Sequence, residues 1–230
     1  MENSHILLKK LFCPKRIELV RNDIFSVFNS YCEEKKINQN IFELFSNDLQ
    51  GFKSCALATQ KLISLYSLGT DDKLLSELKN LCEISKPSFN TKPCLAFSSP
   101  RTSIDESYWK LPAHQDYHSN LGSKNGVTCW IPLVPITSEL GFLEVVEGSH
   151  HLGPLEQEDF HGVPVLKKQD WHFSPIKMEM GDVLVFHNLT IHRSGINSTD
   201  QIRLTAHLRY NDLAEKSYIN SGYPKNRTND

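Results

Sequence analysis

The chain reads E-M-G-D-V-L-V-F-H-N-L-T-I-H-R-S-G-I-N-S-T-D-Q-I-R-L-T-A-H-L-R-Y from Glu179 to Tyr210. This stretch predicts three short strands. An apolar, β-branched run over 183–186 is followed by alternating residues over 190–196 and again over 201–210. The four residues 197–200, Asn-Ser-Thr-Asp, have the composition of a turn between the last two strands. The stretch is therefore typical of an antiparallel β protein.

A hairpin centred on this turn would pair Ser194 with Arg203 and His192 with Thr205. Because strand side chains alternate between faces, these four polar residues would share one face. An Arg beside a Ser offers a bidentate fork and one further donor, which suits a small dicarboxylate ligand. A solvated polar strand face is the alternative interpretation of the same pattern.

A second polar motif, L-P-A-H-Q-D-Y-H, covers residues 111–118. If this motif is a strand, His114 and Asp116 point to the same side, because they are two residues apart. Together with one distal His they would form the two-His, one-carboxylate triad of non-haem Fe(II) oxygenases. His192 is the expected distal ligand, since it lies eleven residues before Arg203, whereas His187 is expected to be a structural neighbour.

These motifs resemble the phytanoyl-CoA dioxygenase family of Fe(II)- and 2-oxoglutarate-dependent oxygenases. The resemblance covers roughly the last 120 residues. The matching segments are 114–116 (H-Q-D), 128–133 (T-C-W-I-P-L), 141–150 (G-F-L-E-V-V-E-G-S-H), 181–187 (G-D-V-L-V-F-H), 191–195 (I-H-R-S-G) and Arg203.

The resemblance implies a double-stranded β-helix, or jelly roll, with Fe(II), 2-oxoglutarate and O2 as cofactor and cosubstrates. His114, Asp116 and His192 would hold the metal and form the catalytic site. Arg203 and Ser194 would bind the distal carboxylate of 2-oxoglutarate, with Trp130 and Gln115 also in the cosubstrate site. A strand Trp is as often a core residue, so both interpretations of Trp130 stay open.

Composition and length narrow the class of protein. With 230 residues, 39% hydrophobic residues and a net charge of −2, the chain is expected to fold as one globular domain. No basic balance predicts nucleic-acid binding, and no apolar run predicts a membrane span. The six cysteines are scattered and no signal peptide is recognised, which favours a reducing, cytoplasmic setting.

The two parts of the chain differ in pattern. Residues 1–90 are expected to form a helical buttress, with helices over 14–35, 41–49, 55–68 and 72–81, and residues 91–230 the jelly-roll catalytic core. Roughly eight strands are expected in this core. A polar loop over 98–110 carries Tyr108 and Trp109, which could contact substrate or pack on the barrel rim. The chain is thus expected to be mainly β, with helices at its N-terminus.

The predicted function is oxidative: hydroxylation of a small molecule with release of succinate and CO2. Two other classes remain open, a cupin-like metalloenzyme without redox chemistry and a non-catalytic jelly-roll binding module. Fold and motif do not identify the substrate or the oligomeric state. The linear sequence shows no basic cluster suited to the phosphates of an acyl-CoA.

Overall fold

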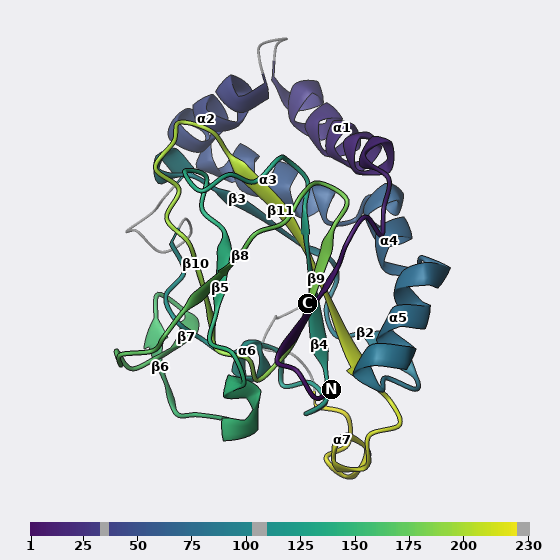
Figure 1. Ribbon diagram of the computed structural model, residues 1–230. Helices are drawn as coiled ribbons and strands as arrows, with labels where there is room; N and C mark the ends of the chain where they lie inside the picture. Colours follow the sequence, from purple (N-terminus) through teal and green to yellow (C-terminus); the bar gives the residue numbers. More distant parts are fainter. Residues whose placement is uncertain (33–36, 103–109, 225–230) are drawn as a thin grey trace.

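The computed structural model describes residues 1–32, 37–102 and 110–224 (Figure 1). Its strands form three antiparallel sheets. The large sheet has the order β1-β9-β4-β11-β2, with β3 also paired to β11; the small sheet has the order β10-β5-β8, and β6 pairs with β7. The strands are β1 (His5–Leu8), β2 (Pro87–Phe89), β3 (Cys94–Ser98), β4 (Val127–Pro132), β5 (Leu143–Val145), β6 (Gln157–Phe160), β7 (Val163–Leu166), β8 (Ser174–Ile176), β9 (Val183–His187), β10 (His192–Ser194) and β11 (Arg203–Asp212).

Helices α1 to α5 lie together against the large sheet, on the side away from the small sheet (Figure 1). The helices are α1 (Pro14–Tyr31), α2 (Ile37–Asn47), α3 (Leu49–Thr59), α4 (Ile63–Gly69), α5 (Asp72–Cys82), α6 (Asp116–Asn120) and α7 (Lys216–Asn220). The prediction of a mainly β protein with N-terminal helices is confirmed. Among the described residues, no helix is long and apolar enough to cross a membrane.

Strand β11 shows how the two layers are joined. Its residues Leu204, Ala206 and Leu208 are buried in the core that the sheet shares with α1, α4 and α5. The residues between them point the other way, because strand side chains alternate, and line a cavity between the two sheets. These cavity residues of β11 are Arg203, Thr205, His207 and Arg209.

The predicted hairpin of the last two strands is wrong. β10 pairs with β5, placing His192 opposite Val145, whereas β11 pairs with β3, placing Arg203 opposite Ser98. The connection crosses from one sheet to the other. The Asn197 side chain stabilises this crossing by donating to the carbonyls of Ser98 and Gln201, at 3.0 and 2.9 Å. His192 and Arg203 therefore face one cavity from opposite sheets, not from one strand pair.

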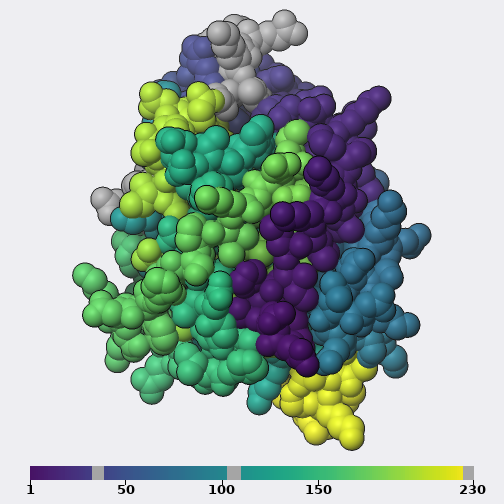
Figure 2. Space-filling view, viewed as in Figure 1, coloured from purple at the N-terminus to yellow at the C-terminus, as the bar shows by residue number. Residues whose placement is uncertain are grey.

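The N-terminal region departs from the predicted helical buttress at β1, which extends the large sheet by pairing with β9. In Figure 2 the N-terminal residues form a purple band between the green strands and blue helix α5. Some helix boundaries predicted from the apolar pattern are also wrong. Residues 38–40, predicted to break the helices, lie within α2, and the single helix predicted over 55–68 is two helices, α3 and α4. Short-range turn bonds around residues 58–62 separate these two helices.

Replacing Leu204 with alanine tests the shared core. Leu204 is 1% exposed, so we expect Leu204→Ala to lower the free energy of unfolding by about 2–5 kcal/mol. Urea denaturation measures this change. The matched control is Leu213→Ala, at a residue 40% exposed, where a loss of about 1 kcal/mol or less is expected. Equal losses in both variants would contradict this assignment of the core.

Candidate active site

Three buried side chains converge at one end of the cavity between the sheets. One ligand atom from each of His114, Asp116 and His192 lies within 4.8 Å of the others, and the three residues are 5%, 2% and 4% exposed. His114 lies beside β10 through two backbone hydrogen bonds with His192, of 3.0 and 3.1 Å. The predicted continuous strand over this motif is wrong, because Asp116 is the first residue of α6. Extended backbone at Gln115 still leaves both side chains on the cavity side.

Both histidines present the same ring nitrogen to the cavity. The Nδ1 of His114 lies 2.8 Å from the Pro112 carbonyl, and the Nδ1 of His192 lies 3.0 Å from the Thr190 carbonyl. Because a carbonyl oxygen only accepts, each Nδ1 must donate its proton. Each Nε2 therefore keeps its lone pair for a metal ion, and the backbone determines the tautomer.

The protonation states also suit metal binding. Burial, and then the neighbouring His192, lower the pKa of His114 to about 3. Burial likewise lowers the pKa of His192. Burial alone would raise the pKa of Asp116, but Arg209 and the two histidines outweigh it and hold that pKa well below its usual range. At neutral pH the trio therefore consists of two neutral imidazoles and one carboxylate.

Asp116 is held by two residues to which the sequence analysis gave no role. Arg209 donates from Nε and Nη2 to the two carboxylate oxygens, at 3.2 and 3.3 Å. The Thr128 hydroxyl donates to Oδ2 at 2.6 Å. Arg209 comes from β11 and Thr128 from β4, so the large sheet orients a ligand that belongs to α6. Alternation along β11 already placed Arg209 on the face of Arg203, which was the available signal.

Arg203 lies in the same cavity as a buried cation, and its hydrogen-bond partners among the described residues are all neutral. Its Nη1 donates to the carbonyls of Gly141 and Gly195 at 2.9 and 3.2 Å, and its Nη2 donates to Ser98 Oγ at 3.2 Å. Within the part of the chain that the structure describes, its Nε has no hydrogen-bond partner. Burial lowers the pKa of Arg203 to about 10, which leaves it charged at neutral pH. A cation buried in this way calls for an anion.

The other predicted site residues fall into two groups. Trp130 and Ser194 line the cavity, which has a volume of about 90 Å³, together with the metal trio and Arg203. Gln115 does not: its amide donates to the carbonyls of Gly153 and Leu189 and accepts from the backbone N–H of Leu155. The prediction that Gln115 contacts the cosubstrate is therefore corrected; its side chain ties together three backbone segments.

Comparison with known proteins agrees with this arrangement. A family model described as "Phytanoyl-CoA dioxygenase (PhyH)" matches residues 56–205. The chain belongs to the phytanoyl-CoA dioxygenase family. Peroxisomal phytanoyl-CoA dioxygenase of Bos taurus is 27% identical over 224 residues, covering 88% of this chain and 63% of that protein. The 1-deoxypentalenic acid 11-beta-hydroxylase of Streptomyces arenae is 38% identical over 102 residues, covering 39% of this chain and 35% of that protein.

Solved structures show the same fold as this phytanoyl-CoA dioxygenase family member. The epimerase SnoN, in complex with Fe3+, alpha ketoglutarate and nogalamycin RO, has a TM-score of 0.65 at 17% identity, covering 92% of this chain and 80% of that one. The non-heme monooxygenase ThoJ has a TM-score of 0.65 at 15% identity, covering 92% and 75%. At such identities the likeness concerns the fold alone, and it confirms the predicted jelly roll.

Roles were also predicted for His187, Tyr108 and Trp109, which are not among the residues of the metal trio. His187 is not part of the trio; its ring lies 5.3 Å from that of His150, and its Nδ1 accepts from the N–H of Leu189. This placement agrees with the expected structural role. Tyr108 and Trp109, predicted as possible substrate contacts, lie outside the described residues.

Replacing Arg209 tests the buried ion pair of this family member. Arg209→Gln leaves the carboxylate of Asp116 buried without a countercharge, so we expect it to lower the free energy of unfolding by about 3–5 kcal/mol. Urea denaturation of metal-free protein at pH 7 measures the loss. Arg193→Gln is the control, because Arg193 is 45% exposed and its pair with Glu144 should contribute about 1 kcal/mol or less. Similar losses in the two variants would refute this role of Arg209.

Proposed function

We propose that this chain is an Fe(II)- and 2-oxoglutarate-dependent oxygenase that hydroxylates a small molecule. The observation that carries the proposal is the shared cavity: a possible metal trio at one end and, in the same space, the cation Arg203, which no anion among the described residues neutralises. A metal site alone would suit many enzymes. A metal site facing a buried arginine suits a ligand that chelates metal and also carries a distal carboxylate.

Iron is held by His114, Asp116 and His192 in this proposal. Two neutral imidazole nitrogens and one carboxylate form the donor set of non-haem Fe(II) enzymes. The carbonyls of Pro112 and Thr190 orient the two rings, and Arg209 with Thr128 orients the carboxylate. When bound, iron with 2-oxoglutarate and O2 supplies the oxidising chemistry, in which 2-oxoglutarate becomes succinate and CO2 and one oxygen atom enters the substrate.

Arg203 and Ser194 bind the distal carboxylate of 2-oxoglutarate in this proposal. The free Nε of Arg203 is a donor already positioned in the cavity, and the anion would supply the missing countercharge. Trp130 forms part of the cavity wall and helps to exclude water. His207 lies in the same wall, where burial lowers its pKa to about 3, so it adds no competing positive charge near neutral pH.

The relatives support oxygenation and a small-molecule substrate. They are named as a dioxygenase of phytanoyl-CoA, a hydroxylase of 1-deoxypentalenic acid and, in Gimesia maris, a methylphosphonate hydroxylase. The chain spans 63% of the first of these proteins and 35% of the second, so the substrate is not transferred from them. We also propose a reducing, cytoplasmic setting, which the six free cysteines support.

Succinate formation tests the proposal. Anaerobically prepared protein is loaded with Fe(II), given 2-oxoglutarate and O2, and screened against a metabolite library for substrate-stimulated succinate and CO2. His192→Ala, prepared identically, provides the background. Succinate above this background supports the oxygenase. Substrate conversion without succinate would indicate a cupin-like enzyme, and metabolite binding without conversion a binding module; either result would overturn the proposal.

A further inference from the structure

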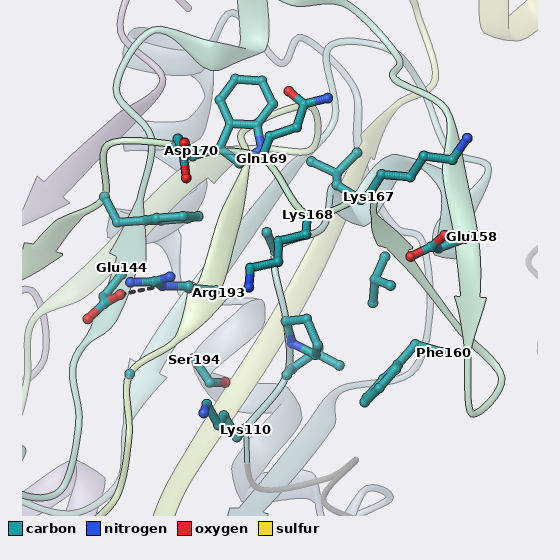
Figure 3. Close-up of a pocket in the computed structure, with 18 of the residues that line it drawn as sticks. Lys110, Glu144, Glu158, Phe160, Lys167, Lys168, Gln169, Asp170, Arg193 and Ser194 are labelled. Atoms are coloured by element: carbon teal, nitrogen blue, oxygen red, sulfur yellow. Dashed lines mark hydrogen bonds and ion pairs between the residues drawn. The ribbon is translucent and has the colours of Figure 1, made fainter.

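A second, larger cavity lies outside the candidate active site. Its volume is about 680 Å³, within the range of pockets that hold drug-sized ligands. Leu111 and Ser194 line both this outer cavity and the inner one, so the two are adjacent. The outer cavity is bounded by residues 110–113, by β6 and β7 with the segment after them, and by β10 (Figure 3).

The walls of the outer cavity combine apolar side chains with polar and charged ones. Aromatic and aliphatic side chains come from three separate segments of the chain. Those from β6, β7 and the following segment are Phe160, Val165, Leu166, Trp171 and Phe173. Such walls favour a ligand with an apolar body, because burying that body removes its surface from water.

The outer cavity is lined by four cations and three anions, which are Lys110, Lys167, Lys168 and Arg193, and Glu144, Glu158 and Asp170. Arg193 is neutralised by Glu144 at 2.5 Å, and its guanidinium lies 3.9 Å from the ring centre of Phe173. Lys167 extends away from the cavity toward the strand of Glu158 (Figure 3). These two cations are therefore directed elsewhere.

Lys168 and Lys110 behave differently. In Figure 3 the Lys168 side chain reaches into the cavity, and the amino end of Lys110 lies on the side of Ser194. Among the described residues, no ion pair involves either lysine. These two cations, 58 positions apart in the sequence, both line the outer cavity, which shares Leu111 and Ser194 with the inner site. The linear sequence could not show that both lysines line one cavity.

We infer that the outer cavity binds the substrate, and that Lys168 and Lys110 hold an oxyanion, a carboxylate or a phosphate-type group, on an otherwise apolar molecule. That the ligand is a substrate rests on the proposed oxygenase function, whereas the anion site itself does not depend on that function. The two lysines would neutralise the charge of the ligand, and the apolar body of the ligand would pack against the aromatic side chains of the cavity wall. The reactive end of the ligand would then approach Ser194 and the inner cavity.

Matched ligands and matched variants test the inference. The probes are 4-phenylbutyrate and its neutral amide, which share an aromatic body and differ in charge. Their dissociation constants are measured by ligand-detected NMR with saturating 2-oxoglutarate present, so that Arg203 is occupied. We expect the acid to bind at least about tenfold more tightly than the amide, as one charged hydrogen bond provides.

The variants are Lys168→Gln and Lys110→Gln, with Lys167→Gln as the control that removes the same charge one position away. The first two should reduce the preference for the acid to about threefold or less, and the control should leave it within about twofold of the parent. Equal binding of acid and amide, binding of neither, or equal loss in Lys167→Gln and Lys168→Gln would overturn the inference.

This test is separable from that of the proposed function. If the parent forms succinate but shows no preference for the acid, only the anion site fails. If the parent prefers the acid through Lys168 but forms no succinate with any metabolite, the oxygenase proposal fails and the outer cavity remains an anion-binding site.

Discussion

His192→Ala is expected to abolish metal binding and succinate formation, whereas His187→Ala is expected to retain both. Loss of a direct ligand should exceed the roughly 10- to 100-fold loss of metal affinity that removal of an outer partner causes. The two histidines are five positions apart, but only His192 places a ring nitrogen in the trio. Titration with Co(II), followed by its visible absorption, measures affinity without catalysis.

His187→Ala is a demanding control because His187 is also neutral and substantially buried, with its pKa lowered to about 4 by burial. The thermal melting of metal-free protein shows whether either variant has lost its fold. Retained Co(II) binding in His192→Ala together with lost binding in His187→Ala would reverse the ligand assignment. For the carboxylate, Asp116→Asn is the better variant, because asparagine keeps one oxygen that can accept from Arg209, whereas Asp116→Ala removes both oxygens that Arg209 binds.

Arg203→Lys is expected to raise the KM for 2-oxoglutarate by about tenfold or more, because a lysine is a point charge and cannot form the bidentate fork. The three donors of an ammonium would all be needed to replace the bonds that Arg203 makes to Gly141, Gly195 and Ser98, which would leave none for 2-oxoglutarate. Co(II) affinity should barely change, because Arg203 is not part of the metal trio. Steady-state kinetics measure the KM, titration of 2-oxoglutarate into Zn(II)-loaded protein measures its binding directly, and titration with Co(II) measures the metal affinity.

The matched control is Arg193→Lys, the same substitution at an arginine that lines only the outer cavity. Its KM for 2-oxoglutarate should stay within about twofold of the parent. Ser194→Ala should act in the direction of Arg203→Lys but more weakly, since it removes one neutral donor. Parent-like 2-oxoglutarate binding in Arg203→Lys would show that the distal carboxylate is held elsewhere.

Local periodicity accounts for what could be predicted in the site. Alternation along β11 put Arg203 and Thr205 on one face and Leu204 on the other, and this holds in the structure. His114 and Asp116 still point to the same side, as their spacing predicted, although Asp116 begins a helix and is not part of a strand. The reason is that Gln115 between them has an extended backbone. Such patterns depend on a few consecutive backbone angles, which neighbouring residues determine.

Strand pairing was not predictable in the same way. The turn composition of residues 197–200 suggested a hairpin, but β10 pairs with β5 and β11 with β3 and β4. A turn sequence is compatible with either outcome. Whether two neighbouring strands pair with each other or with other strands depends on which pairing buries the apolar face of each strand in the core. That burial involves residues more than 40 positions apart.

By itself, the sequence determined which residues to propose for the site: two histidines and one aspartate for a metal, and an arginine at a spacing that suits 2-oxoglutarate. Tertiary structure alone decided which side chains distant in the sequence come together, and with what partners. Arg209 pairs with Asp116 across 93 positions, Gln115 binds backbone instead of cosubstrate, and Lys110 joins Lys168 at the outer cavity. The physical reason is that a charge pair or a cavity wall depends on distance in space, whereas local sequence specifies only direction along a strand or helix.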